Sequence, residues 1–411
     1  MKELWLTVKM ICVVAVFCGA TAIVSPAQFL TTLHSFDGSD GSMPYAGLVQ
    51  ASDGNFYGTT AFGPSSSGYS GFGTVFKVTP NGTLTSLHSF DSSDGAAPYA
   101  ALVQAGDGNF YGTTLEGGSS QSCDRGCGTV FKITPSGSLT TLYSFCASGL
   151  PCPDGASPYA GLVQAADGNF YGTTNTGGAN GFGAVFKITA NGTLTTLHSF
   201  QFSEGIYPEA GLVQASDGNF YGTTFEGGSG CGANGCGTVF KIAADGTLTT
   251  LHMFASSDGQ RPVAGLLQAS DGNFYGTTSE GGTGDCIDGC GTVFKITPNG
   301  TLTVLHSFAG PDGGDPLAAL IQASDGNFYG TTYVRGAYNF GTVFQITPTG
   351  ALTTLHSFID SGSDGFYPYA GLVQATDGNL YGTASDGGDF HYFGTIFRLV
   401  PVRPCIVCSS E

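Results

Sequence analysis

The side chains in this sequence best suited to chemistry are carboxylates in glycine-rich segments. Glu116, Glu226, Glu280 and Asp386 are each followed by Gly-Gly. An ionised carboxylate accepts hydrogen bonds, attracts cations and can ligate a hard metal ion. We therefore take these four residues as candidate binding residues.

Five Asp-Gly dipeptides form a second acidic set, at Asp40, Asp94, Asp154, Asp258 and Asp364. Carboxylates and turn carbonyls are ligands that Ca²⁺ prefers, but no segment has the full alternating-oxygen pattern of a dedicated calcium loop. Turn formation by the Asp side chain explains most of this set more simply. We expect no cofactor, with calcium as the alternative.

Histidine offers one candidate for acid–base chemistry. His391 stands near Asp386 and Asp389, and a histidine beside carboxylates can act as a general base. We add Asp389 and His391 to the candidate binding residues and name no catalytic residue, since a lone loop histidine usually has no catalytic role. The other six histidines recur at one position of a repeat, which favours packing and hydrogen bonding: His34, His88, His198, His252, His306 and His356.

Ten of the 12 cysteines form five local pairs. An even number of paired cysteines in an exported chain predicts disulfides. Zinc is the alternative, but it would require two pairs to converge, and these pairs stand in separate repeats. The predicted disulfides are Cys123–Cys127, Cys146–Cys152, Cys231–Cys236, Cys286–Cys290 and Cys405–Cys408.

A repeat of 50 to 60 residues must position all these groups. The phrase DGNFYG occurs six times and DGNLYG once, with its Asp at 53, 107, 167, 217, 271, 325 and 377. A period of this length is typical of propeller blades and other stacked repeats. Abundant Gly and aromatic residues favour strands and turns over helices.

Each repeat divides into four short β segments, which in the second repeat are 100–105, 109–114, 128–134 and 139–145. Asp107-Gly108 joins the first two, and Asp-Gly is typical of a type I′ hairpin turn. Pro-Ser-Gly joins the last two, while the other connections are longer and variable. Four antiparallel strands in a meander make a propeller blade.

The number of segments predicts a closed ring. Each segment type occurs seven times, but the first copy of the fourth type, residues 30–36, precedes the first full unit, and the last unit lacks one. We expect an all-β, seven-bladed β-propeller with four antiparallel strands per blade, its last blade closed by the N-terminal strand 30–36. Closure removes the exposed edges that an open solenoid would keep.

Strand alternation assigns roles inside a blade. The Phe-Tyr pairs of the second segment, such as Phe110-Tyr111, point to opposite faces and pack between blades. The glutamine of each first segment, such as Gln104, ties blades together by hydrogen bonds. The strand bases, such as Lys132, pair with Asp residues of nearby turns.

The long connections and the tight turns open on opposite faces of a propeller, so function is expected at the variable loops. Of the 30 acids, 20 fall in the variable loops, against three bases, Arg125, Arg261 and Arg335. A face of one sign attracts cations and basic partners. The alternative is that these charges serve solubility. The net charge of −18 argues against nucleic acid and anionic membranes.

The first 27 residues have the pattern of a secretory signal peptide. Lys2 and Lys9 precede an apolar run from Met10 to Val24, with small residues before Ala22 and Ala27. The run is short for a bilayer span, which takes about 20 residues. We expect a signal peptide at 1–27, a propeller at 30–400 and a tail at 401–411, secreted or in the cell envelope. An uncleaved anchor is the alternative.

The unit LHSF…DG…PYAGLVQASDGNFYGTT…GGTVFKITPNGTLTTLHSF, over residues 30 to 400, resembles the GloVer tandem repeat of exported bacterial proteins. That resemblance implies a surface or secreted protein of undefined biochemical role. The phrases DGN…(F/Y)…G and ITPNGT are more faintly similar to NHL, two-component-regulator and virginiamycin B lyase propellers. The catalytic His and Glu of the lyase have no counterparts here, so its activity does not carry over.

These observations favour a monomeric, non-catalytic binding module that takes a ligand, glycan or basic protein on its acidic loop face. An extracellular enzyme acting on a polysaccharide or small molecule at the channel mouth is one alternative. A purely structural envelope protein is the other.

Overall fold

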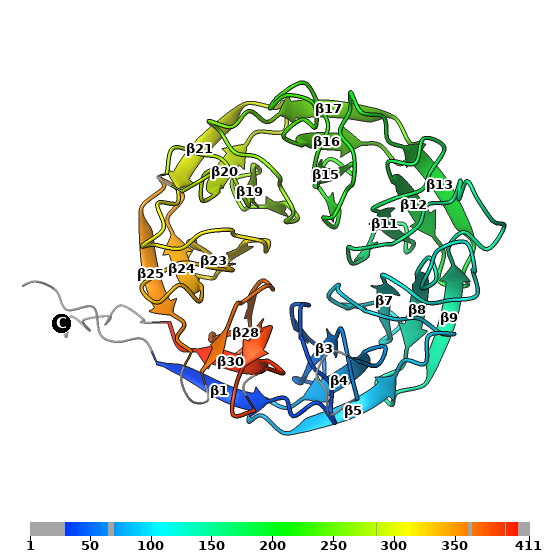
Figure 1. Cartoon of the computed structure of the whole chain (residues 1–411), viewed down its shortest axis with the longest axis horizontal. Helices are drawn as coiled ribbons and strands as arrows, with labels where there is room; N and C mark the ends of the chain where they lie inside the picture. Colours follow the sequence, from blue (N-terminus) through cyan, green and yellow to red (C-terminus); the bar gives the residue numbers. More distant parts are fainter. Residues whose placement is uncertain (1–28, 65–69, 285, 361–363, 391, 402–411) are drawn as a thin grey trace, which may run out of the picture.

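The computed structural model describes residues 29–64, 70–284, 286–360, 364–390 and 392–401. These residues form seven four-stranded antiparallel sheets arranged as blades around a central channel (Figure 1). The prediction of a seven-bladed β-propeller is confirmed. The predicted signal peptide, the Cys405–Cys408 pair and His391 lie outside the described residues.

The innermost strand of each blade is only two residues long, shorter than the six-residue segment expected from the sequence. Its residues precede the Asp-Gly turn and line the channel side of the blade. These strands are β2 (Val49–Gln50), β6 (Val103–Gln104), β10 (Val163–Gln164), β14 (Val213–Gln214), β18 (Leu267–Gln268), β22 (Ile321–Gln322) and β27 (Val373–Gln374).

The second and third strands form the buried centre of each blade, because β-branched and aromatic residues pack on both of their faces. The second strands are β3 (Phe56–Thr60), β7 (Phe110–Thr114), β11 (Phe170–Thr174), β15 (Phe220–Thr224), β19 (Phe274–Thr278), β23 (Phe328–Thr332) and β28 (Leu380–Ala384). The third strands are β4 (Thr74–Val78), β8 (Thr129–Ile133), β12 (Ala184–Ile188), β16 (Thr238–Ile242), β20 (Thr292–Ile296), β24 (Thr342–Ile346) and β30 (Thr395–Leu399).

The outer strands complete the blades, and the N-terminal strand completes the last one. Strand β1 pairs antiparallel with β30, with Leu30 opposite Leu399, so the sheet order is β1-β30-β28-β27. Two short strands, β26 (Gly365–Phe366) and β29 (Asp386–Gly387), pair beside this blade. The outer strands are β1 (Leu30–Ser35), β5 (Leu84–Ser89), β9 (Leu139–Ser144), β13 (Leu194–Ser199), β17 (Leu248–Met253), β21 (Leu302–Ser307) and β25 (Leu352–Ser357).

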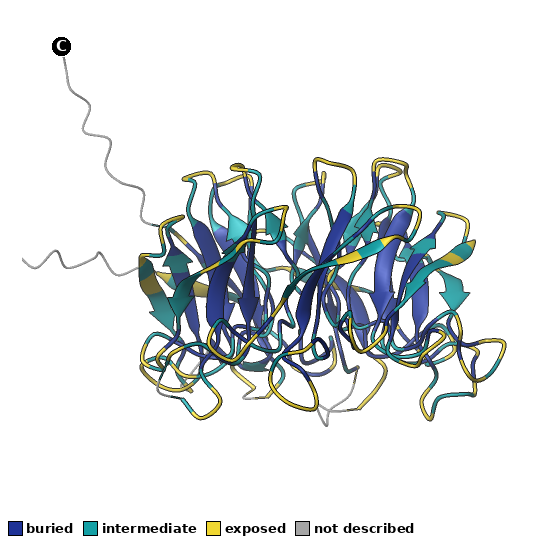
Figure 2. Cartoon of the chain, turned by 90° about the horizontal axis from the view of Figure 1, so that it is seen from above, coloured by how far each residue is buried: buried dark blue, intermediate teal, exposed yellow. Residues whose placement is uncertain are grey.

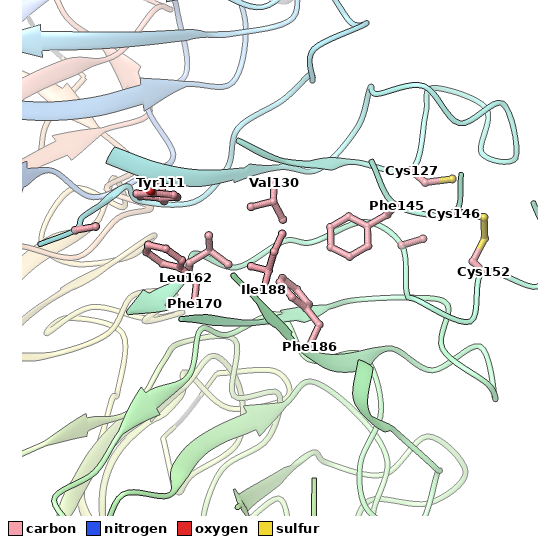
Figure 3. Packing of buried hydrophobic residues seen from close by; sticks show 12 residues of the cluster. Tyr111, Cys127, Val130, Phe145, Cys146, Cys152, Leu162, Phe170, Phe186 and Ile188 are labelled. Atoms are coloured by element: carbon pink, nitrogen blue, oxygen red, sulfur yellow. A yellow bond between two sulfur atoms is a disulfide. The ribbon is translucent and has the colours of Figure 1, made fainter. Parts of the chain in front are cut away.

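The hydrophobic core lies between neighbouring blades. Tyr111 stacks on Phe170 of the next blade, with ring centroids 4.0 Å apart, and Phe145 meets Phe186 edge-on at 5.2 Å. Val130 and Ile188 fill the same cluster, which Figure 3 shows. Aromatic pairs of this geometry add stability beyond the area they bury. The predicted packing of the Phe-Tyr pairs is therefore confirmed.

The Asp-Gly turns differ from the predicted type I′ geometry. The Gly54 N–H donates to Ala51 C=O, and Gly54 alone of the Asp-Gly pair has a positive φ, +81°. Type I′ requires positive φ at both central residues, so the turn is a type I turn followed by a left-handed glycine. The Asp53 side chain accepts the Asn55 N–H, which holds Asp53 in the ordinary conformation.

Glutamines join the blades on the tight-turn side of the ring. Gln104 Oε1 accepts the N–H of Ser52 in the preceding blade, at 2.9 Å. An equivalent hydrogen bond joins the last blade to the first, because Gln50 Oε1 accepts the N–H of Thr376 at 2.8 Å. The predicted role of glutamine between blades is confirmed. Figure 2 shows the longer loops on the opposite side, at the lower edge of the ring.

Candidate functional site

The most distinctive position in the molecule lies just before each inner strand. There a Pro-Tyr-Ala-Gly segment, or a variant of it, lines the channel and a cavity of about 150 Å³. The residue after the proline differs between blades, while its neighbours are nearly constant. In blade order it is Tyr45, Tyr99, Tyr159, Glu209, Val263, Leu317 and Tyr369.

A strained turn aims these residues at the channel. The residue before each proline has φ between 52° and 58°, a left-handed conformation that costs a non-glycine residue about 1–2 kcal/mol. Hydrogen bonds from both sides hold it. In blade 5 the Arg261 N–H donates to Cys236 C=O, and Arg261 C=O accepts the Ser279 N–H. Thr223 of the preceding blade also donates to Ala264 C=O at 3.2 Å.

The four tyrosines form one cluster across the channel. Tyr45 stacks on Tyr99 at 4.9 Å and meets Tyr369 edge-on at 5.0 Å. Tyr99 lies 5.3 Å from Tyr159. The hydroxyls of Tyr159 and Tyr369, from blades 3 and 7, hydrogen-bond at 2.7 Å. Burial raises the pKa of all four phenols, so they stay neutral and can donate hydrogen bonds.

Glu209 occupies the tyrosine position of blade 4. Its side chain is partly buried, and Asn175 Nδ2 donates to Oε1 at 3.4 Å. Burial raises the pKa of Glu209 to about 7, and the nearby Glu226 carboxylate adds to that rise, while Asn175 and Arg261 oppose it. No cation lies within ion-pair distance of Glu209 among the described residues. A desolvated carboxyl without a counter-ion favours a positively charged ligand.

The four sequence-predicted carboxylates Glu116, Glu226, Glu280 and Asp386 lie together on one rim. Each follows its second strand at an equivalent position, and each backbone pairs with the segment before the strained turn, as Glu280 does with Gln260. Their charges act on the tyrosine cluster: Asp386 raises the pKa of Tyr45, after the larger effect of burial. The rim and the cluster therefore form one electrostatic site.

Two arginines form ion pairs with three of these four carboxylates. Arg261 Nη1 lies 2.6 Å from Glu280 Oε1, and Nη2 lies 3.9 Å from Glu226 Oε1. Arg125 lies 3.5 Å from Glu116. Asp386 has no such partner in the described part of the chain; it accepts the Ser385 hydroxyl, and burial raises its pKa. The least neutralised carboxylates at the mouth are thus Glu209 and Asp386.

Asp389 lies away from this site. Its side chain is exposed, and its N–H donates to Ser35 Oγ of outer strand β1. Neither Glu209 nor the four tyrosines are among the site residues predicted from the sequence. The available signal was the second position of the phrase PYAGLVQ, which varies most between blades and reads PEAGLVQ in blade 4.

The repeat-position histidines lie on the outermost strands, where each contacts a carboxylate of the following loop. His34 Nε2 lies 2.7 Å from Asp40 Oδ2, and Tyr143 takes the histidine's place beside Asp154. The Asp-Gly carboxylates proposed as alternative calcium ligands are therefore engaged by protein groups. The other pairs are His88–Asp94, His198–Glu204, His252–Asp258, His306–Asp312 and His356–Asp364.

Four of the predicted disulfides are present: Cys123–Cys127, Cys146–Cys152, Cys231–Cys236 and Cys286–Cys290. The expectation that pairs from separate repeats stay apart is wrong for the first two. The sulfurs of Cys123, Cys127 and Cys152 lie within 4.8 Å of one another, because adjacent loops of blade 2 carry them. All three are in disulfides, so none is a thiolate ligand.

The solved structures that this chain is similar to share little sequence with it. The extracellular domain of a candidate hybrid two-component system, BT3049 of B. thetaiotaomicron, aligns at 13% identity with a TM-score of 0.55, covering 90% of this chain and 41% of that one. This chain thus spans less than half of that domain. The Pseudomonas aeruginosa periplasmic gluconolactonase PpgL aligns at 19% identity and a TM-score of 0.48, covering 82% and 97%. A search of curated proteins gave no match.

The fold and the site define a seven-bladed β-propeller with an acidic, tyrosine-lined channel mouth. The chain belongs to the family of the Gloeobacter/Verrucomicrobia repeat, whose profile matches residues 17–233 and 229–404. The four disulfides fit an exported protein. Within the described residues, no helix is long and apolar enough to cross a membrane.

Proposed function

We propose that this protein is an exported binding protein that takes a cationic partner, such as a basic protein segment, on its variable-loop face. The observation that carries the proposal is the unequal neutralisation of the two faces. On the tight-turn face, the turn aspartates pair with strand lysines, as Lys132 does with Asp107 at 2.9 Å. On the loop face, Glu209 and Asp386 lack such partners among the described residues.

The loop face also has recesses for a partner's side chains. A cavity of about 400 Å³ lies between the loops of the first two blades and is lined by Glu116, Asp124 and Arg125. Another of about 370 Å³ is lined by Gln260, Glu280 and Asp288. Recesses of this size on a rigid scaffold suit recognition by inserted side chains.

The test is binding of a fluorescent oligolysine peptide to residues 28–411, with an oligoglutamate peptide of equal length as control. Oligolysine should bind, and its affinity should fall steeply with added salt because the attraction is electrostatic. The triple variant Asp124→Asn, Asp288→Asn, Asp386→Asn should weaken binding. The matched control Ser138→Lys, Ala244→Lys, Thr301→Lys changes the net charge equally on the tight-turn face and should affect binding less. Equal losses would reject the loop face as the site.

An enzyme at the channel mouth is the second candidate, and Glu209 favours it. A carboxyl with a pKa near neutrality suits general acid–base catalysis. The cavity beside it, however, is smaller than the roughly 300–1,000 Å³ of ordinary substrate pockets. A hydrolase and lactonase substrate panel, with Glu209→Gln as the inactive control, tests this candidate. Turnover that Glu209→Gln abolishes would establish it.

A further inference from the structure

The channel mouth is divided into an aromatic side and an aliphatic side. Blades 7, 1, 2 and 3 supply Tyr369, Tyr45, Tyr99 and Tyr159 as a continuous cluster. Blades 5 and 6 supply Val263 and Leu317 on the other side of the same cavity. A ligand in this cavity can thus contact the aliphatic side chains with its methylene stem and the tyrosine side chains with its head group.

Glu209 lies between these two sides, and its carboxylate favours a ligand with a positive charge. Its carboxyl lines the cavity, and the amide of Asn175 is its one hydrogen-bond donor among the described residues. A carboxylate in a half-buried site gains most from a ligand that brings both positive charge and N–H donors. Tyrosine faces attract cations as well.

The size of the cavity limits which chemical groups of a ligand can fit. About 150 Å³ accommodates a compact head group rather than a sugar chain or a whole drug-sized molecule. An ammonium is a compact point charge with three donors, whereas a guanidinium is a wide planar fork that matches a carboxylate in a bidentate manner. Glu209 has an oxygen already shared with Asn175, which disfavours the bidentate arrangement.

From these observations we infer that the channel mouth is a subsite for a primary ammonium group on an alkyl stem, with Glu209 as its counter-ion and Val263 and Leu317 as the wall for its methylenes. This subsite rests on the proposed function and names the group that a cationic partner inserts. A lysine side chain and a free alkylamine or polyamine share this chemistry.

The experiment is isothermal titration of residues 28–411 with butylammonium chloride, N-acetyl-lysine methylamide and spermidine, with n-butanol as the uncharged control. The ammonium probes should bind, while butanol should not. Glu209→Gln should weaken ammonium binding about tenfold or more, since it removes a desolvated charge partner. The matched variant Glu204→Gln alters a loop glutamate that contacts His198 of an outermost strand, away from the channel mouth, and should change affinity little.

A gain-of-function variant tests the same subsite if the Glu209→Gln variant fails to fold. Val263→Glu places a second carboxylate on the cavity wall and should tighten binding of the same probes. Stronger binding of the lysine derivative than of spermidine identifies a peptide side chain as the source, and the reverse identifies a polyamine. Absence of ammonium binding, or binding that Glu209→Gln leaves unchanged, overturns the subsite, even where oligolysine still binds the loop face in a salt-dependent manner.

Discussion

At the scale of single residues, departures from the repeat are more informative than the repeat itself. In most blades the last threonine of the second strand hydrogen-bonds the first threonine of the third, as Thr278 does with Thr292 at 2.9 Å. In blade 7 alanine replaces the first member, as Ala384, and Thr395 Oγ1 is buried without a hydrogen-bond partner among the described residues. A buried hydroxyl left unpaired costs about 1–3 kcal/mol.

Ala384→Thr should therefore stabilise the protein by about 1 kcal/mol, because it restores the hydrogen bond found in five of the other six blades. Urea unfolding of residues 28–411 measures the change. The reverse change in an intact pair, Thr278→Ala, should destabilise by a comparable or larger amount. An Ala384→Thr variant less stable than the wild type would show that blade 7 cannot hold the second hydroxyl.

Glu209 gives a second prediction at this scale. Its folded pKa of about 7 exceeds the ordinary value of 4.5, so the folded carboxyl keeps a proton that the unfolded one loses. The free energy of unfolding should thus fall by about 3 kcal/mol as pH rises from about 4.5 to 7. The charged groups facing it are Glu226 and Arg261, beside the phenols of Tyr159 and Tyr369.

Glu209→Gln removes this titration. The variant should become more stable relative to the wild type as pH rises through that interval, which melting temperatures at pH 5, 6, 7 and 8 measure. A difference between the two proteins that stays constant with pH would contradict the raised pKa.

At the scale of elements, the Asp-Gly hairpin is a stabilised unit repeated in every blade. Asp271 accepts hydrogen bonds from Asn273, Tyr275 and Lys295. Burial alone would raise the pKa of Asp271, but these hydrogen bonds outweigh it and lower the pKa. The pKa values of the equivalent aspartates in the other six blades are also lowered.

Because folding lowers these pKa values, their contribution to stability is present above about pH 4 and is lost as pH falls further. The melting temperature should therefore drop steeply below pH 4. Tyr275→Phe removes one hydrogen bond while keeping the ring stacked on Phe328, and should cost about 1 kcal/mol at pH 7. A flat melting temperature between pH 4 and pH 2 would contradict this role of the turns.

The sequence predicted these elements well because strand alternation and turn residues are local signals. The Phe-Tyr pairs, the glutamine links and the lysine–aspartate pairs all follow from a single repeat. The exact turn type does not follow from a single repeat, because type I and type I′ turns differ in the sign of φ at Asp53. The histidine–carboxylate pairs could have been predicted from their spacing: His34 and Asp40 are six residues apart.

At the scale of the whole molecule, the ring is closed by contacts between residues at the two ends of the propeller. Strand β1 pairs with β30, Phe36 packs on Phe76 of blade 1, and Gln50 accepts the N–H of Thr376. Thr383 also donates to Ala46 C=O across the same junction, at 3.1 Å. Equivalent contacts occur at the other junctions between blades, so the interface between blades 7 and 1 has the same structure as the other interfaces.

Removal of residues 29–36 should therefore lower the melting temperature and promote self-association, because it opens β30 as an edge and leaves Phe76 without Phe36. Size-exclusion chromatography and thermal unfolding measure both effects. Truncation after residue 401 is the control and should be neutral. A shortened chain that stays monomeric and equally stable would contradict closure by β1.

The site was less predictable than the fold because its parts converge only once the ring forms. Tyr159 and Tyr369 are 210 residues apart in sequence, yet their hydroxyls hydrogen-bond across the channel. The sequence located the rim carboxylates Glu116, Glu226 and Glu280, but their neutralisation by Arg125 and Arg261 depends on contacts between loops. That no described residue supplies a counter-ion to Glu209 could be recognised only in three dimensions.

Hydrogen exchange of residues 28–411 with and without saturating oligolysine tests the assignment of the binding face most directly. Amides of the loop face, such as 116–126 and 280–290, should exchange more slowly with the peptide present, while the tight turns at 51–55 and 105–109 should not change. Protection of the tight turns with unchanged loops would place the partner on the opposite face and contradict the account.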